Sequence, residues 1–179
     1  MRALKAIAAS IFFALAACGQ GDETNAADTQ TSQAAPSGAV TDAEKAAILA
    51  SMQVRANAQG QVENECSELV TPQFLPAEIG PGVGRAVAFV MEGGPNTATC
   101  YGDGPLVQLM RSSGGEWTQI YMNRGGSMII LSTQHNGAND LADGGPGFSF
   151  PVWQWNGSEY ANANRQVSDA ALSDARFLP

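Results

Sequence analysis

The chain has 179 residues and a formal net charge of −8, from 17 acidic and nine basic residues. Hydrophobic residues make up 44% of it, which suffices for the core of one ordinary domain. The acidic balance excludes nucleic acids, which are bound through clustered Lys and Arg, and anionic lipid surfaces that are bound through a polybasic patch.

The N-terminus carries the pattern of an export signal. Two basic residues come first, and the stretch 6–17 that follows is almost entirely apolar. This stretch is too short for a membrane-spanning helix, which needs about 20 apolar residues, but it has the proportions of a secretory signal. It ends in Leu15-Ala16-Ala17-Cys18, which resembles the lipobox of bacterial lipoproteins at all four positions.

The lipobox resemblance implies a processing route. In that family the Cys thiol receives diacylglycerol, the peptide is cut before the Cys, and the new amine is acylated. Residues 1–17 are then a signal peptide and Cys18 is the lipidated first residue of the mature protein, whose net charge becomes −10 because only two basic residues are lost. Gly19 is similar to the outer-membrane class, so the expected location is the cell envelope, on the periplasmic face of the outer membrane in a Gram-negative host. An ordinary signal peptide followed by a chance Cys is the alternative.

The mature chain is expected to divide into a tether and one domain. Residues 18–40 comprise the lipidated Cys and a segment with no aromatic and almost no large aliphatic residue, which predicts a disordered tether. Residues 41–179 contain all three Trp and all three Tyr and have the size of a single globular domain. Within it we expect a helix over 41–58, mainly β structure over 62–160 and a C-terminal tail over 161–179.

A capping box opens the predicted helix, since Thr41 is followed three residues later by Glu44. Apolar residues then recur at helical spacing: Ile48, Leu49, Met52 and Ala56. Gly60 is a candidate helix end. The stripe is interpreted as packing on the domain, with a partner-binding helix as the alternative.

From residue 85 onward the pattern favours an antiparallel meander of hairpins, with a small α+β fold as the alternative. The predicted strands are Arg85–Met91, Leu106–Arg111, Trp117–Met122, Ser127–Leu131 and Phe148–Trp155. Asn156-Gly157 predicts a type I′ turn, and Pro151 indicates an edge strand or a bulge. After residue 161 a short helix around 168–174 and an unstructured tail are both compatible with the sequence.

Cys66 and Cys100 remain once the anchor is set aside, and an oxidising envelope favours a disulfide between them. It would close a loop of 33 intervening residues and stabilise the fold by about 3–4 kcal/mol in the chain-entropy model. A metal or redox pair is disfavoured because the spacing is wide and the chain has a single His. No cofactor is expected.

Residues 63–160 resemble a group of uncharacterised exported bacterial proteins, distantly similar to the FG-GAP modules of integrin-like proteins. The motifs that carry the resemblance are Cys100-Tyr101-Gly102, Gly115-Glu116-Trp117 and the stretch GGPGFSFPVWQWNG at 144–157. Where relatives have an Asp-rich, calcium-binding type of loop, residues 77–84 offer only Glu78. Relatives also carry Cys where Ser149 stands, so a second disulfide is not expected. The resemblance implies a fold but no activity.

The predicted polar loop 135–144 is the candidate metal site. Its oxygen ligands for a hard cation would be Asn139, Asp140 and Asp143, although these residue types more often cap turns through their own backbone. The same loop holds His135, the only conventional base for a catalytic triad. Its possible orienting carboxylates are Asp103, Asp140 and Asp143, and glycosidase-like pairs among Glu92, Asp103 and Glu116 are not settled by sequence spacing.

Trp153 and Trp155 form a candidate binding stripe near Phe148 and Phe150, with core packing as the competing interpretation. No complete catalytic set is recognised. We therefore predict a membrane-anchored envelope lipoprotein that is a non-enzymatic binding module for an envelope protein or peptidoglycan. A cell-wall or glycan hydrolase is the alternative.

Overall fold

The computed structural model describes residues 38–179 and confirms that they are mainly β, with antiparallel sheets and one α-helix. The predicted signal peptide, the lipidated Cys18 and nearly all of the predicted tether lie outside the described residues. No helix within 38–179 is long and apolar enough to cross a membrane.

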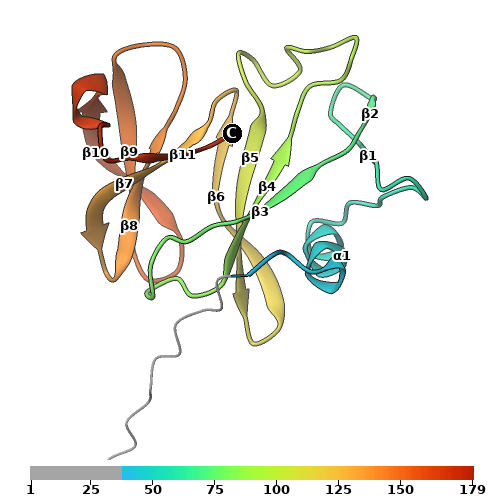
Figure 1. Cartoon of the computed structure of the whole chain (residues 1–179), viewed down its shortest axis with the longest axis horizontal. Coiled ribbons are helices and arrows are strands. Elements are labelled where there is room, and N and C mark those ends of the chain that lie inside the picture. Colours follow the sequence, from blue (N-terminus) through green and yellow to red (C-terminus); the bar gives the residue numbers. More distant parts are fainter. Residues whose placement is uncertain (1–37) are drawn as a thin grey trace, which may run out of the picture. The chain divides into compact units, whose positions relative to one another are not determined.

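Two antiparallel meanders make up most of the fold (Figure 1). The elements are α1 (Asp42–Ser51), β1 (Val62–Glu63), β2 (Leu69–Val70), β3 (Gln73–Pro76), β4 (Ala86–Met91), β5 (Leu106–Ser113), β6 (Glu116–Arg124), β7 (Met128–His135), β8 (Ala138–Asp143), β9 (Ser149–Trp155), β10 (Tyr160–Ser168), the 3-10 helix η1 (Asp169–Ala171) and β11 (Arg176–Leu178). One sheet has the order β3-β4-β5-β6 and the other β10-β9-β8-β7-β11, while β1 and β2 pair separately.

Strand alternation divides the apolar side chains among three clusters. The first lies between the two sheets, and β4 supplies Ala86, Ala88 and Val90 to it. Alternate residues of β4, such as Phe89, belong to a second cluster on the other face of the four-stranded sheet, which α1 covers (Figure 1). The third cluster includes Ile129 and lies on the outer face of the five-stranded sheet. Burial on both faces explains why β4 is apolar throughout.

The capping box of α1 is confirmed. The Glu44 backbone N–H donates to Thr41 Oγ1 at 3.2 Å, and Glu44 Oε2 accepts from the Thr41 backbone N–H at 2.8 Å. The helix ends at Ser51, however, so the prediction of a helix to residue 58 is wrong. Gln53 adopts a φ of 59°, and the Val54 N–H bonds back to the Leu49 carbonyl at 2.9 Å. These contacts terminate the helix well before Gly60, without a glycine at the left-handed position.

The predicted tail over 161–179 is also wrong. The chain continues β10 to Ser168, makes one turn of 3-10 helix and then adds β11 to the edge of β7. The 3-10 helix η1 lies within 168–174, the range in which the sequence was compatible with a short helix. Leu172 packs into the third cluster, so this segment gains its order from the outer face of the five-stranded sheet. The short strands β1, β2 and β3 were not predicted, because few residues in them carry a periodic pattern.

The turn predictions had mixed outcomes. Asn156-Gly157 is not a two-residue type I′ turn, since four residues separate β9 from β10 and only Gly157 of this pair has positive φ. Asn136-Gly137 is instead the two-residue turn with positive φ at both positions, between His135 and Ala138. Pro151 lies next to a register shift in the pairing of β9 with β10, as the bulge interpretation expected.

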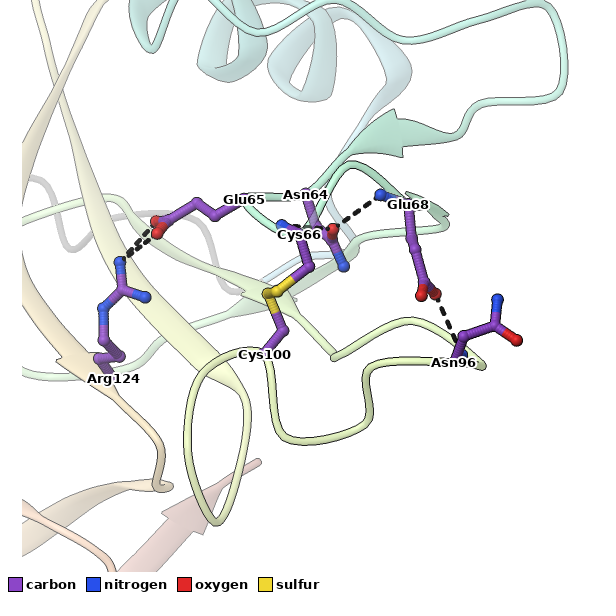
Figure 2. The surroundings of a disulfide bond; sticks show 7 residues. All are labelled: Asn64, Glu65, Cys66, Glu68, Asn96, Cys100 and Arg124. Atoms are coloured by element: carbon purple, nitrogen blue, oxygen red, sulfur yellow. Dashed lines mark hydrogen bonds and ion pairs between the residues drawn. A yellow bond between two sulfur atoms is a disulfide. The ribbon is translucent and has the colours of Figure 1, made fainter.

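The predicted disulfide between Cys66 and Cys100 is present, with a Cα–Cα distance of 6.0 Å. Figure 2 shows that it links the turn after β1 to the long loop before β5. The Asn64 side chain shapes this turn, because its Oδ1 accepts from two backbone N–H groups, at 2.9 and 3.0 Å. Glu68 reaches across to the backbone N–H of Asn96 at 3.2 Å, and Glu65 pairs with Arg124 (Figure 2). The two loops are therefore joined by one covalent bond and one hydrogen bond, and the ion pair with Arg124 ties the turn after β1 to the end of β6.

The ion pair between Glu44 and Arg85 gives a pH-dependent prediction. Arg85 donates to Glu44 at 2.9 Å, and this contact, followed by the Thr41 N–H, lowers the pKa of Glu44 to about 2. A lowered carboxyl pKa stabilises the fold fully above the unfolded pKa of 4.5, and this contribution is lost as the pH falls through about 2. We expect Glu44→Gln to cost about 1–2 kcal/mol at pH 7, after allowance for solvent screening.

Urea unfolding at pH 7 and pH 2.5 checks this prediction, and the difference between wild type and variant should shrink at the lower pH. Glu116→Gln serves as the matched control, because Glu116 is exposed and makes no ion pair among residues 38–179. A difference that stays constant with pH would contradict the prediction that the ionised Glu44 carboxylate stabilises the fold.

Candidate functional site

A fully buried carboxylate lies on the outer face of the five-stranded sheet. Asp140 has no exposed surface, and it sits in the middle of β8 on the same face as Ala142 of the third cluster. Its Oδ2 accepts from Thr133 Oγ1 and from Arg165 Nη2, both at 2.6 Å, and its Oδ1 contacts His135 Nδ1 at 2.7 Å. Such a group is costly to bury unless it is paired and hydrogen-bonded, and here three side chains meet that need.

Two strand irregularities bring these partners to Asp140. On β7, residues 131–133 lie opposite the single residue Asp140, which places Thr133 beside it. On β10, residues 163–165 lie opposite one residue of β9, and Asn164 adopts a φ of 53°. Arg165 therefore reaches Asp140 across β9. Bulges are often found next to functional sites, where they redirect a side chain.

His135 connects this buried group to the surface. Its side chain is 48% exposed, and the Gln154 amide nitrogen lies 2.9 Å from Nδ1 and 3.0 Å from Nε2, against the imidazole ring. A pocket of about 250 Å³ opens here between the β7–β8 turn and the β9–β10 turn. It is lined by His135, Asn136, Gln154, Trp155, Asn156, Ala161, Asn162 and Ala163. None of these residues is an acid, a lysine or an arginine.

The three candidate metal ligands do not converge. Asp140 is engaged by its three side-chain partners, whereas the Asn139 side chain donates to the Leu131 carbonyl at 2.7 Å. Asp143 accepts from the Tyr121 hydroxyl at 2.5 Å, and burial together with this carboxylate raises the pKa of Tyr121. Residues 138–143 form a strand rather than the predicted loop, so neighbouring side chains point to opposite faces. The described part of the chain contains no group of three His, Cys, Asp or Glu able to hold a metal.

The aromatic residues near β9 do not form one exposed stripe. Trp155 is 2% exposed in the cluster between the sheets, as the core interpretation expected, and it also lines the pocket beside His135. Trp153 packs partly buried against the same cluster. Phe150 belongs to the outer cluster, and Phe148 is 86% exposed at the start of β9. The burial follows from the alternation of β9 between the two sheet faces.

Two of the catalytic candidates, His135 and Asp140, are in contact. His135 contacts Asp140, so the predicted orienting carboxylate for the His is present, but the nearby Thr133 hydroxyl donates to that same carboxylate. Glu116 begins β6 at the hairpin end of the four-stranded sheet, whereas Glu92 follows β4 at the other end. Six residues of β4 separate these ends by about 16 Å, more than the 5–10 Å of glycosidase pairs.

No known protein family matches the chain, and neither does any curated protein or solved structure. The resemblance of residues 63–160 to exported proteins and to FG-GAP modules therefore stays a prediction.

Several residues of this site were missed by sequence reasoning. Arg165 lies in the segment that was predicted to be a tail, and the polar composition of β8 concealed its strand character. Asn136-Gly137 was the available signal, since this dipeptide between two β-like segments indicates a tight hairpin. Gln154 and Asn162 carry no such signal, because their proximity depends on the pairing of β9 with β10.

Asp140→Asn is expected to lower the free energy of unfolding by about 1–3 kcal/mol, because Arg165 loses its charged partner. The chain has a single His, so its ring ¹⁵N resonances report the site directly. In wild type the neutral ring should carry its proton on Nδ1, where Asp140 accepts it, and the variant should lose this preference. Asp103→Asn, at an exposed carboxylate, is the control. An unchanged tautomer in Asp140→Asn would contradict the pairing.

Proposed function

We propose that the chain is an exported bacterial lipoprotein, anchored in the cell envelope by acyl chains on Cys18, whose β domain is a non-enzymatic binding module. The observation that carries the proposal is the lipobox, Leu15-Ala16-Ala17-Cys18. The disulfide between Cys66 and Cys100 supports export, because such bonds persist in oxidising compartments and are rare in the cytosol. The partner would be an envelope protein or a cell-wall component.

The pocket beside His135 supports binding rather than hydrolysis. Its lining holds no acid, and the Asp140 carboxylate behind it is committed to three side chains. A hydrolase would need a nucleophile beside His135 or a second carboxylate within reach. Thr133 and Glu116 do not fill these roles in the arrangement described above. The binding interpretation requires only a concave surface, such as the pocket beside His135.

Lipidation is tested by detergent-phase partition and mass spectrometry of the mature N-terminal peptide. We expect the wild-type protein to enter the detergent phase and to begin at a Cys18 that carries acyl chains. Cys18→Ala should remain aqueous, whereas Gly19→Ala, which leaves the lipobox intact, should behave as wild type. A wild-type N-terminus at any other residue would overturn the anchored assignment.

Binding and hydrolysis are separated by one experiment on purified peptidoglycan sacculi. We expect the full-length protein, solubilised in detergent, to sediment with the sacculi and to release no soluble sugar. Release of reducing ends would contradict the non-enzymatic role. If the partner is a protein, crosslinking in living cells should capture one dominant species that is lost in Cys18→Ala, the mislocalised control.

A further inference from the structure

We propose that the pocket between the β7–β8 and β9–β10 turns is a binding site for a neutral glycan, with one sugar ring seated against His135 and the surrounding carboxamides. The inference rests on the proposed function and deepens it, because it names the class of envelope ligand. It starts from the pocket's composition: four of its eight lining residues are Asn or Gln, at positions 136, 154, 156 and 162.

Hydrogen bonds to the backbone hold two of these carboxamides in place. Asn136 Nδ2 donates to the Trp155 carbonyl at 2.8 Å. Asn156 Oδ1 accepts from the backbone N–H groups of Ser158 and Glu159, at 2.9 and 3.0 Å. In each of these two side chains, either the carboxamide oxygen or the amino group is thus already hydrogen-bonded, and this bond orients the side chain before any ligand binds. Asn162 pairs with Trp153, so its side chain lies on the sheet face opposite Gln154.

The remaining oxygen or amino group of each of these two carboxamides is left to form a hydrogen bond with a sugar hydroxyl. Among residues 38–179, Asn136 Oδ1 and the amino group of Asn156 make no hydrogen bond. The pocket therefore offers a pre-oriented acceptor and a pre-oriented donor together, and a hydroxyl acts as both. Pre-orientation lowers the entropy cost of binding, which matters for weak polar ligands.

The charge of the site selects a neutral ligand. No acidic, Lys or Arg side chain lines the pocket, so neither a carboxylate nor an ammonium group would find its counter-ion there. Asp140, which contacts His135 of the lining, already pairs with Arg165 at 2.6 Å. The chain's net charge of −8 further disfavours anionic glycans. A volume of about 250 Å³ lies just below the roughly 300–1,000 Å³ of pockets for drug-sized ligands, which suits a single ring of a longer chain.

The two bulges and the buried Asp140 supply the rigidity that such a site needs. Asp140 holds His135 through Nδ1, and the His135 ring in turn contacts the Gln154 amide. Asn136 and Asn164 both adopt left-handed φ values, 50° and 53°, which non-glycine residues seldom take. Asn136 adopts this conformation in the two-residue turn between β7 and β8, which fixes its position beside the pocket.

Titration of the full-length protein in detergent tests the proposal, with chitotriose as the neutral probe and trigalacturonate as the anionic one. We expect chitotriose to bind with a Kd of about 0.1–10 mM and to shift the ring resonances of His135, while trigalacturonate binds at least tenfold more weakly. Gln154→Ala and Asn156→Asp, which removes the free amino group, should each weaken chitotriose binding about tenfold. Gln119→Ala is the matched control, because Gln119 is an exposed amide on β6 of the other sheet and should bind as wild type.

Unchanged melting temperatures establish that the variants fold. The proposal is overturned if chitotriose does not bind at about 10 mM, if both pocket variants bind as wild type does, or if a neutral tetrapeptide binds in its place. Sacculus sedimentation of the same variants then tests the envelope-binding function separately from the assignment of this pocket as the binding site. Sedimentation that persists in both pocket variants would leave the envelope-binding function standing and remove only this pocket as its site.

Discussion

Trp155→Ala is expected to lower the free energy of unfolding by about 3–5 kcal/mol. Trp155 is 2% exposed and lies between the two sheets, with its ring centroid 5.5 Å from that of Tyr160. The Arg111 guanidinium lies 5.3 Å from its ring centroid, on the opposing sheet. Truncation would leave a cavity at the sheet interface and remove these contacts together. Urea unfolding followed by far-UV circular dichroism measures the loss independently of tryptophan fluorescence.

The matched control is Phe148→Ala, which removes an aromatic ring immediately before the same strand. Phe148 is 86% exposed, so its loss should change stability by no more than about 0.5 kcal/mol. A comparably small effect for Trp155→Ala would contradict the core assignment.

Removal of the disulfide by the double substitution Cys66→Ala and Cys100→Ala should cost about 3–4 kcal/mol. The bond spans a sequence separation of 34 residues, and its loss releases a loop of that size in the unfolded state. In the folded state the same loop includes β4, which lies in the interior of its sheet. Denaturant unfolding of the double variant and of wild type measures the difference.

Two comparisons make this prediction specific. Wild-type protein in excess reductant should unfold at the same denaturant concentration as the double variant. Cys18→Ala should retain the wild-type midpoint, because Cys18 is assigned to the lipid anchor and not to the disulfide. An unfolding midpoint that is indifferent to reductant would show that the closed loop contributes little to stability.

The features that could be predicted from sequence are local ones, or ones with few alternatives. Thr41 and Glu44 predict the start of α1 because a capping box involves only residues close in sequence. β4 could be predicted as a strand because its six consecutive buried residues form a continuous apolar run. The pairing of Cys66 with Cys100 followed from there being no other cysteine once Cys18 was assigned to the anchor.

The sequence by itself thus determined the export signal pattern, the β class and the disulfide, while the tertiary structure decided the site. Asp140 looked like a loop residue because its strand is polar, and its burial depends on a bulge in β7 and on Arg165 from β10. Trp155 looked like a binding residue because alternation does not tell which sheet face is covered. Pairing between distant strands sets burial and side-chain convergence, and no local pattern encodes it.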